Sequence, residues 1–180
     1  MVRIALIGPE STGKSTLCGA LATHFGFSLV NEYARDYLDK IGRAYTLNDV
    51  LLIYRNQYST EQGLISSNPR GMFVDTEFIN GKVWCEEKFG ASPDWFTQMI
   101  QNHPYDLYLL TTPDLSWEPD PLRENPDKAD YFFLRYKQQL EFYKLNYATI
   151  GGVGEQRLKA AIDAVEVLLQ KRSIGPESFV

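Results

Sequence analysis

Residues 8–16 have the sequence Gly-Pro-Glu-Ser-Thr-Gly-Lys-Ser-Thr, which matches the phosphate-binding pattern G-x-x-x-x-G-K-[ST] at every fixed position. In this pattern the glycines let backbone N–H groups surround a phosphate, and the following helix N-terminus adds positive potential. The pattern predicts that Lys14 contacts the β- and γ-phosphates of ATP and that the Ser15 hydroxyl ligates Mg²⁺. Thr16 fits a contact to the α-phosphate and equally an ordinary first-turn position. The residues expected to bind ATP are Gly8, Glu10, Ser11, Thr12, Gly13, Lys14, Ser15 and Thr16.

Phosphoryl transfer also needs a carboxylate on the metal side of the nucleotide. Asp75 follows the apolar run Met72-Phe73-Val74, which places it at the end of a predicted buried strand. We therefore expect Asp75 to hold Mg²⁺ together with Ser15 and to belong to the catalytic machinery with Lys14. The alternative is an ordinary turn or cap residue at a strand end.

A second acidic residue, Glu32, follows the next short apolar segment in the run Asn31-Glu32-Tyr33-Ala34-Arg35. It is a candidate general base that accepts the proton of an attacking hydroxyl. The alternative is an acid that complements the dipole at a helix N-terminus. Arg35, one turn later, fits three roles: orienting Glu32, contacting substrate, or forming a surface i,i+3 pair.

The segment 112–126 contains four prolines and is predicted to be a long loop. With the start of the next helix it forms a candidate lid over about residues 112–135. The loop carries Trp117, Asp120 and Arg123, and a mobile arginine that reaches the transferred phosphate is a recurrent solution in such enzymes. For Arg123, and more so for Lys128 and Arg135, the alternative is a solvated basic side chain.

The elements that must position these residues follow from apolar patterning. Short buried strands are predicted at 2–7, 27–30, 71–74, 106–111 and 147–150, with Asp75 at the end of the third. Helices are predicted at 14–25, 32–41, 46–66, 78–89 and 127–144, together with one that starts at an Ser92 N-cap before Pro93 and a final one carrying apolar residues from Leu158 to Leu169. Thr46 and Asp49 resemble a capping box. Alternating strands and helices predict an α/β fold: a five-stranded parallel sheet with helices on both faces, the three-layer P-loop arrangement, as one domain over 1–180.

Composition excludes several classes of protein. The chain has 180 residues, with 18 Lys and Arg against 23 Asp and Glu, giving a net charge of −5 and a pI near 5.1. This balance argues against a general nucleic-acid binder, and no apolar run is long enough to span a membrane. Cys18 and Cys85 lie far apart, so we expect two free thiols in a cytoplasmic protein. No pattern indicates an oligomeric state.

The chain resembles the ribosylnicotinamide kinase domain of the NadR family over most of its length. The resemblance rests on residues 8–16, on Glu32-Tyr-Ala-Arg35, on Asp75-Thr-Glu-Phe-Ile79 and on Trp117-Glu-Pro-Asp-Pro-Leu-Arg123. It implies a P-loop kinase that uses ATP and Mg²⁺ to phosphorylate the 5′-hydroxyl of nicotinamide riboside, giving NMN. Pro119 and Pro121 depart from the family pattern in the lid. Because the sequence starts at the first strand, we expect neither adenylyltransferase activity nor a repressor role.

The implied small-molecule acceptor carries a pyridinium cation, which suits aromatic faces near carboxylates. Core packing is the simpler explanation for Phe78 and Trp84, and the adenine is expected near residues 151–157. Two rivals remain: another small-molecule kinase of this fold, and a nucleotide-binding switch or ATPase without a small acceptor. The residues expected to bind the acceptor are Glu32, Tyr33, Arg35, Asp75, Phe78, Trp84, Trp117 and Asp120.

Overall fold

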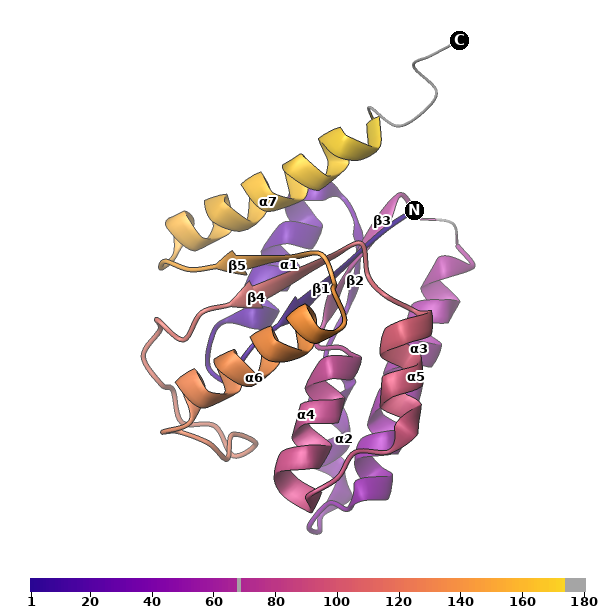
Figure 1. The fold of residues 1–180 in the computed structure, drawn as a ribbon, viewed down its shortest axis with the longest axis vertical. Helices are drawn as coiled ribbons and strands as arrows, with labels where there is room; N and C mark the ends of the chain where they lie inside the picture. Colours follow the sequence, from indigo (N-terminus) through magenta and orange to yellow (C-terminus); the bar gives the residue numbers. More distant parts are fainter. Residues whose placement is uncertain (68, 174–180) are drawn as a thin grey trace.

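The computed structural model describes residues 1–67 and 69–173. Its centre is a parallel sheet of five strands in the order β2-β3-β1-β4-β5, seen edge-on in Figure 1. Neighbouring strands that are not consecutive in sequence require helical crossovers, as expected for a parallel α/β sheet. The strands are β1 (Val2–Ile7), β2 (Ser28–Val30), β3 (Gly71–Asp75), β4 (Leu107–Thr111) and β5 (Tyr147–Ile150).

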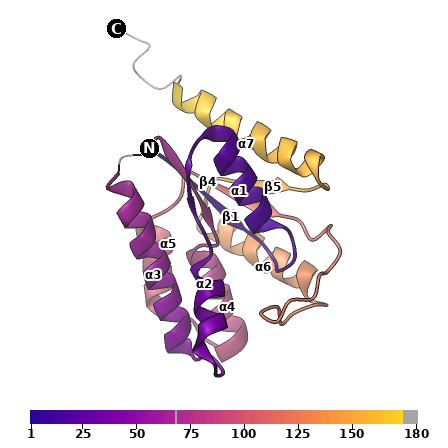
Figure 2. The ribbon, with the colours of Figure 1, turned by 180° about the vertical axis from the view of Figure 1, so that it is seen from behind.

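Within residues 1–67 and 69–173, seven helices surround the sheet. Helices α1 and α7 pack on one face, and the helices from α2 to α6 build the thicker layer on the other, as the two opposite views in Figures 1 and 2 show. The helices are α1 (Lys14–Phe25), α2 (Tyr33–Ile41), α3 (Leu47–Ile65), α4 (Phe78–Phe89), α5 (Asp94–Asn102), α6 (Ala129–Phe142) and α7 (Glu155–Ser173).

Two apolar clusters hold these layers together, one on each side of the sheet. Ile4, Leu6 and Phe73 pack toward α1 and α7, whereas Ala5 and Val74 pack toward the helices of the other layer. The β1, β3 and β4 strands are buried on both faces almost throughout, which is why they form continuous apolar runs rather than alternating patterns.

The predicted fold class is confirmed, and each predicted strand and helix is present with small differences at its ends. The capping box of Thr46 and Asp49 is confirmed in full. The N-cap prediction for α5 is wrong: Pro93, not Ser92, occupies that position. Helix α6 covers Ala129–Phe142 and is therefore shorter at both ends than the predicted 127–144 segment. The expected domain 1–180 includes residues 68 and 174–180, which lie outside the described residues.

Strand order brings the candidate site together at one edge of the sheet. The C-terminal ends of β1, β3 and β2 are neighbours, with Leu6 paired to Asp75 and Val30 paired to Val74. The phosphate-binding loop after β1, the carboxylate of Asp75 and the residue Glu32 after β2 therefore share this edge, where parallel sheets bind ligands.

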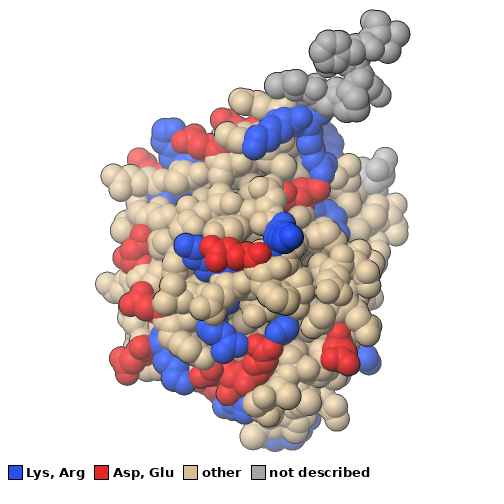
Figure 3. Space-filling view, viewed as in Figure 1, with Lys and Arg blue, Asp and Glu red and all other residues tan. Residues whose placement is uncertain are grey.

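On the face seen in Figure 3, acidic and basic side chains are interspersed. Across the described ranges, no helix combines the length and the apolar character that a membrane crossing requires. Cys18 and Cys85 are both buried free thiols.

Candidate functional site

The loop between β1 and α1 has the backbone shape that a phosphate-binding loop requires. Gly8 and Gly13 adopt φ values of +147° and +73°, which side chains rarely tolerate. A Cβ at Gly8 would lie 2.3 Å from the Thr111 Oγ1 atom, so this strand end admits no side chain. The Thr12 hydroxyl fixes the loop from inside, through bonds to the Pro9 carbonyl oxygen at 2.9 Å and to the Thr111 hydroxyl at 2.7 Å.

Lys14 lies at the start of α1 with its ammonium group inside this loop. Its Nζ donates a hydrogen bond to the Pro9 carbonyl oxygen at 2.6 Å. Burial lowers the pKa of Lys14, while the charges of Asp75, Glu32 and Glu10 act in the opposite direction. A desolvated ammonium group near three carboxylates is well placed to exchange the Pro9 carbonyl for phosphate oxygens.

Ser15 lies in the first turn of α1, and Asp75 is the last residue of β3. Burial raises the pKa of Asp75, while the Ser15 side chain acts in the opposite direction. The Oδ1 atom of Asp75 is buried and has no hydrogen-bond partner among the described residues. A hydroxyl and a carboxylate with a free oxygen form the hard donor set that Mg²⁺ prefers, so these residues fit that ion.

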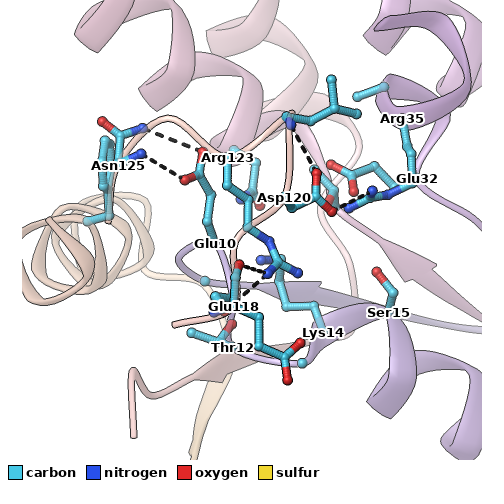
Figure 4. Close-up of a pocket in the computed structure, with 18 of the residues that line it drawn as sticks. Glu10, Thr12, Lys14, Ser15, Glu32, Arg35, Glu118, Asp120, Arg123 and Asn125 are labelled. Atoms are coloured by element: carbon cyan, nitrogen blue, oxygen red, sulfur yellow. Dashed lines mark hydrogen bonds and ion pairs between the residues drawn. The ribbon is translucent and has the colours of Figure 1, made fainter. Parts of the chain in front are cut away.

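Glu32 occupies the N-cap position of α2, yet its side chain makes no capping hydrogen bond. Its carboxylate instead faces the cavity beside Arg35 and Asp120 (Figure 4). Burial raises the pKa of Glu32, and the charge of Asp75 adds to this effect, while Lys14 and Arg35 oppose it. A raised pKa makes a carboxylate a better proton acceptor, which is the property that a general base requires.

The loop between β4 and α6 covers the phosphate-binding loop. The Ser11 hydroxyl accepts hydrogen bonds from the Glu118 backbone N–H at 2.9 Å and from Arg123 Nη1 at 3.3 Å. Glu10 accepts from the Asn125 backbone N–H at 3.1 Å, so its side chain holds the lid. Figure 4 shows Arg123 ending close to Lys14. This loop, the candidate lid, thus contacts the phosphate-binding loop through Glu118, Arg123 and Asn125.

The same loop also contacts the opposite wall of the cavity. Arg35 Nη1 donates to the Asp120 carboxylate at 2.9 Å. The Tyr45 hydroxyl donates to Glu124 at 3.0 Å and accepts from Trp84 Nε1 at 3.1 Å. Tyr45 and Trp84 form an edge-to-face pair with centroids 5.2 Å apart. The lid therefore bridges the phosphate loop and an aromatic wall.

The space under the lid is a cavity of about 1460 Å³. Its walls include Lys14, Ser15, Glu32, Arg35, Trp84, Asp120 and Arg123 among the predicted residues, and Tyr45, Tyr54, Asn80 and Tyr136 among those not predicted. Val153, Gly154 and Glu155 also line it, which is where the adenine was expected.

Three aromatic residues expected to contact the acceptor do not line this cavity. Phe78 is 2% exposed and belongs to the apolar core, so the packing alternative holds for it. Tyr33 packs against the same core. Trp117 lies on the lid, with the guanidinium of Arg123 over its indole ring, 6.0 Å from the ring centroid.

The two other basic residues considered for the lid form ion pairs: Lys128 with Glu87, and Arg135 with Glu86.

Arg157, which the sequence did not single out, holds the phosphate loop from behind. This side chain is 4% exposed and donates to the carbonyl oxygens of Gly152 at 2.7 Å, Thr12 at 2.6 Å and Thr112 at 3.1 Å. It also forms an ion pair with Asp114. One guanidinium thereby joins the phosphate loop, the lid base and the loop after β5. Its partners are mostly backbone carbonyls, which leave no pattern in a sequence.

Comparison with known proteins agrees with this geometry. A family model described as an AAA domain matches residues 3–157, most of the chain. The chain belongs to this AAA-domain family.

Two curated relatives, from Salmonella typhimurium and Escherichia coli, are both called trifunctional NAD biosynthesis/regulator protein NadR. They are 28% and 29% identical to this AAA-domain chain over 133 residues, which cover 71% of the chain and 32% of each relative. The chain thus spans about a third of the length of these relatives.

Solved structures share the fold. The NadR protein in complex with NR has a TM-score of 0.77 at 21% identity, covering 93% of this chain and 50% of that one. The complex of NadR with NAD and AMP-PNP gives 0.74 at 22% identity, with 93% and 49% covered. Deoxyadenosine kinase from M. mycoides with bound dATP gives 0.58 at 10% identity, with 92% and 100% covered. The chain therefore has the fold of the P-loop kinases.

Proposed function

We propose that the protein is a kinase that transfers the γ-phosphoryl group of ATP to the 5′-hydroxyl of nicotinamide riboside, producing NMN and ADP. The observation that carries this proposal is the position of Glu32, whose carboxylate is free of capping bonds and lines the same cavity as Lys14. A base on one side and a phosphate loop on the other leave space for an acceptor hydroxyl between them.

In the proposed reaction the acceptor oxygen forms a bond to the γ-phosphorus, and the bond from that phosphorus to the bridging oxygen of ADP breaks. Glu32 takes the proton of the attacking hydroxyl. Lys14 and the backbone N–H groups of residues 8–16 hold the β- and γ-phosphates, and Arg123 stabilises charge on the group in transfer. Ser15 and Asp75 would hold Mg²⁺, which when bound neutralises phosphate charge.

Two facts support nicotinamide riboside as the acceptor. Relatives named NadR cover 71% of the chain, and a solved NadR complex contains NR. In addition, Trp84, which forms an edge-to-face pair with Tyr45, lines the cavity, and an indole face suits a pyridinium cation. A different nucleoside is the second candidate, because deoxyadenosine kinase shares the fold.

The test is a side-by-side phosphorylation assay with ATP, Mg²⁺ and nicotinamide riboside, uridine, thymidine or deoxyadenosine. We expect nicotinamide riboside to give the highest kcat/KM, and Lys14→Ala to reduce turnover by orders of magnitude because the phosphates lose their cation. A preference for another nucleoside would replace the acceptor and keep the kinase. ATP hydrolysis that ignores every nucleoside would contradict the proposal.

A further inference from the structure

Gln57, a residue of α3 with no assigned role, is 2% exposed and lies between the ends of two neighbouring strands. Its Oε1 accepts a hydrogen bond from the Tyr33 backbone N–H at 3.0 Å. Its Nε2 donates to the carbonyl oxygens of Asp75 at 2.8 Å and of Thr76 at 2.6 Å. These partners fix the orientation of the amide, because only this one matches donors with acceptors on both sides.

The contact with Tyr33 satisfies an N–H group at the start of α2. Such groups have no partner within a helix. The bond therefore holds the backbone immediately after Glu32, the N-cap residue. The Glu32 carboxylate itself makes no capping bond and stays available to the cavity.

The contacts with Asp75 and Thr76 hold the end of β3 in an uncommon conformation. Thr76 adopts a φ of +73°, which a β-branched residue maintains only when its surroundings impose it. The Thr76 backbone N–H bonds to the Leu6 carbonyl oxygen at 3.2 Å, and the Gln57 amide holds the other side of the same residue. This turn directs the chain from the Asp75 carboxylate into α4.

We propose that Gln57 is a positioning residue that sets Glu32 relative to Asp75. This inference rests on the proposed function, because it assigns a task to the same base and the same carboxylate. One amide joins the segment that carries Glu32 to the segment that carries Asp75. Without it, the backbone that carries Glu32 is no longer held to the end of β3, and the carboxylate moves away from the acceptor hydroxyl.

The experiment is a double-mutant cycle of Gln57→Met with Glu32→Gln, run in the full chain with whichever nucleoside the parent phosphorylates. Met keeps the length of the side chain and removes both hydrogen-bonding groups. We expect Gln57→Met to lower kcat roughly 10- to 100-fold, as small displacements of catalytic groups do, while KM for ATP and for the nucleoside changes less than about threefold. In the Glu32→Gln background the same substitution should cost much less activity, because the part of its effect that passes through Glu32 is already lost.

Gln62→Met is the matched control, since Gln62 is an exposed glutamine of the same helix, and we expect parental kinetics. Titration with ATP and Mg²⁺ verifies that each variant is folded. If Gln57→Met fails this check, Gln57→Asn takes its place, because it keeps an uncharged amide and shortens the side chain by one methylene group, so that it cannot reach both segments.

Equal losses in the two backgrounds, or a parental kcat in Gln57→Met, would overturn the inference and leave the proposed function intact. Full activity of Glu32→Gln alone would instead remove the proposed base, and with it the role of Gln57. A wrong acceptor is detected separately, in the comparison of nucleosides, because the cycle uses the nucleoside that reacts.

Discussion

Arg35 and Asp120, 85 positions apart in the chain, form an ion pair of 2.9 Å that ties the first turn of α2 to the lid. Two hydrogen bonds lower the pKa of Asp120: the one from the Leu122 backbone N–H has the larger effect, and the one from Arg35 adds to it. The pair lies at the acceptor side of the cavity, beside Glu32 (Figure 4). Lid closure and the position of α2 are therefore linked.

We expect Asp120→Asn to loosen the lid without unfolding the protein. Asparagine keeps an oxygen for the Leu122 N–H and loses the attraction to Arg35. KM for the nucleoside should rise, and proteases should cleave the segment 112–128 faster. Asp163→Asn is the control, because it removes the exposed Lys159–Asp163 pair on α7. Identical proteolysis of both variants would show that the Arg35–Asp120 pair does not hold the lid.

The two carboxylates should separate by their effects. Glu32→Gln should lower the rate of transfer roughly 10²- to 10⁴-fold and preserve binding of ATP with Mg²⁺, whereas Asp75→Asn should weaken the dependence on Mg²⁺. Burial and Asp75 raise the pKa of Glu32, and the base works only when ionised. The parental kcat should therefore fall with decreasing pH at a pKa above the usual glutamate range. A loss of nucleotide affinity in Glu32→Gln would assign Glu32 to the metal.

Trp84→Leu and Trp117→Leu test which tryptophan contacts the acceptor. A cation on an aromatic face gains on the order of 1–2 kcal/mol when water is excluded. Trp84 lines the cavity, so its replacement should weaken binding of nicotinamide riboside about tenfold, equivalent to 1.4 kcal/mol, and affect uridine less. Trp117 packs against Arg123, so Trp117→Leu should leave this affinity unchanged. Calorimetric titration of both variants decides, and the reverse ranking would return the acceptor to the lid.

Glu77 predicts how stability changes with pH. Burial raises the pKa of this carboxyl to about 8. Between about 4.5 and 8 the unfolded state therefore releases a proton that the folded state keeps, so the free energy of unfolding falls as pH rises through this window. Glu77→Gln keeps an acceptor for the Ile79 N–H and removes the titration. Urea unfolding of both proteins at pH 5 and pH 8 should show a steeper loss for the parent, and equal losses would contradict the assignment.

Much of the fold could be predicted because its signals are local. The phosphate-binding loop is recognised by the spacing of its residues. Thr46 and Asp49 form a capping box that marks the start of α3. The prediction of Ser92 as the N-cap of α5 was wrong because proline is common both at the first position of a helix and just before it. The sequence alone therefore did not show that Pro93 itself is the N-cap. The predicted ends of α6, at 127 and 144, each differ by two residues from the observed Ala129–Phe142.

Within the site, the residues that the sequence missed act through contacts distant in the chain. Gln57 and Arg157 bind backbone carbonyls 18 and 145 positions away, and no residue pattern encodes such partners. Trp117 and Trp84 look alike as isolated tryptophans, and only the path of the lid separates the one on the cavity wall from the one beneath Arg123.

The bracing of the phosphate loop by Arg157 has a consequence for synthesis on the ribosome. The guanidinium that supports the Thr12 carbonyl emerges 145 positions after the phosphate-binding loop. A nascent chain that has completed β1 and α1 thus still lacks the support for its own loop. Competence to capture nucleotide then arises only when β5 docks beside β4 and the start of α7 reaches back to the phosphate-binding loop.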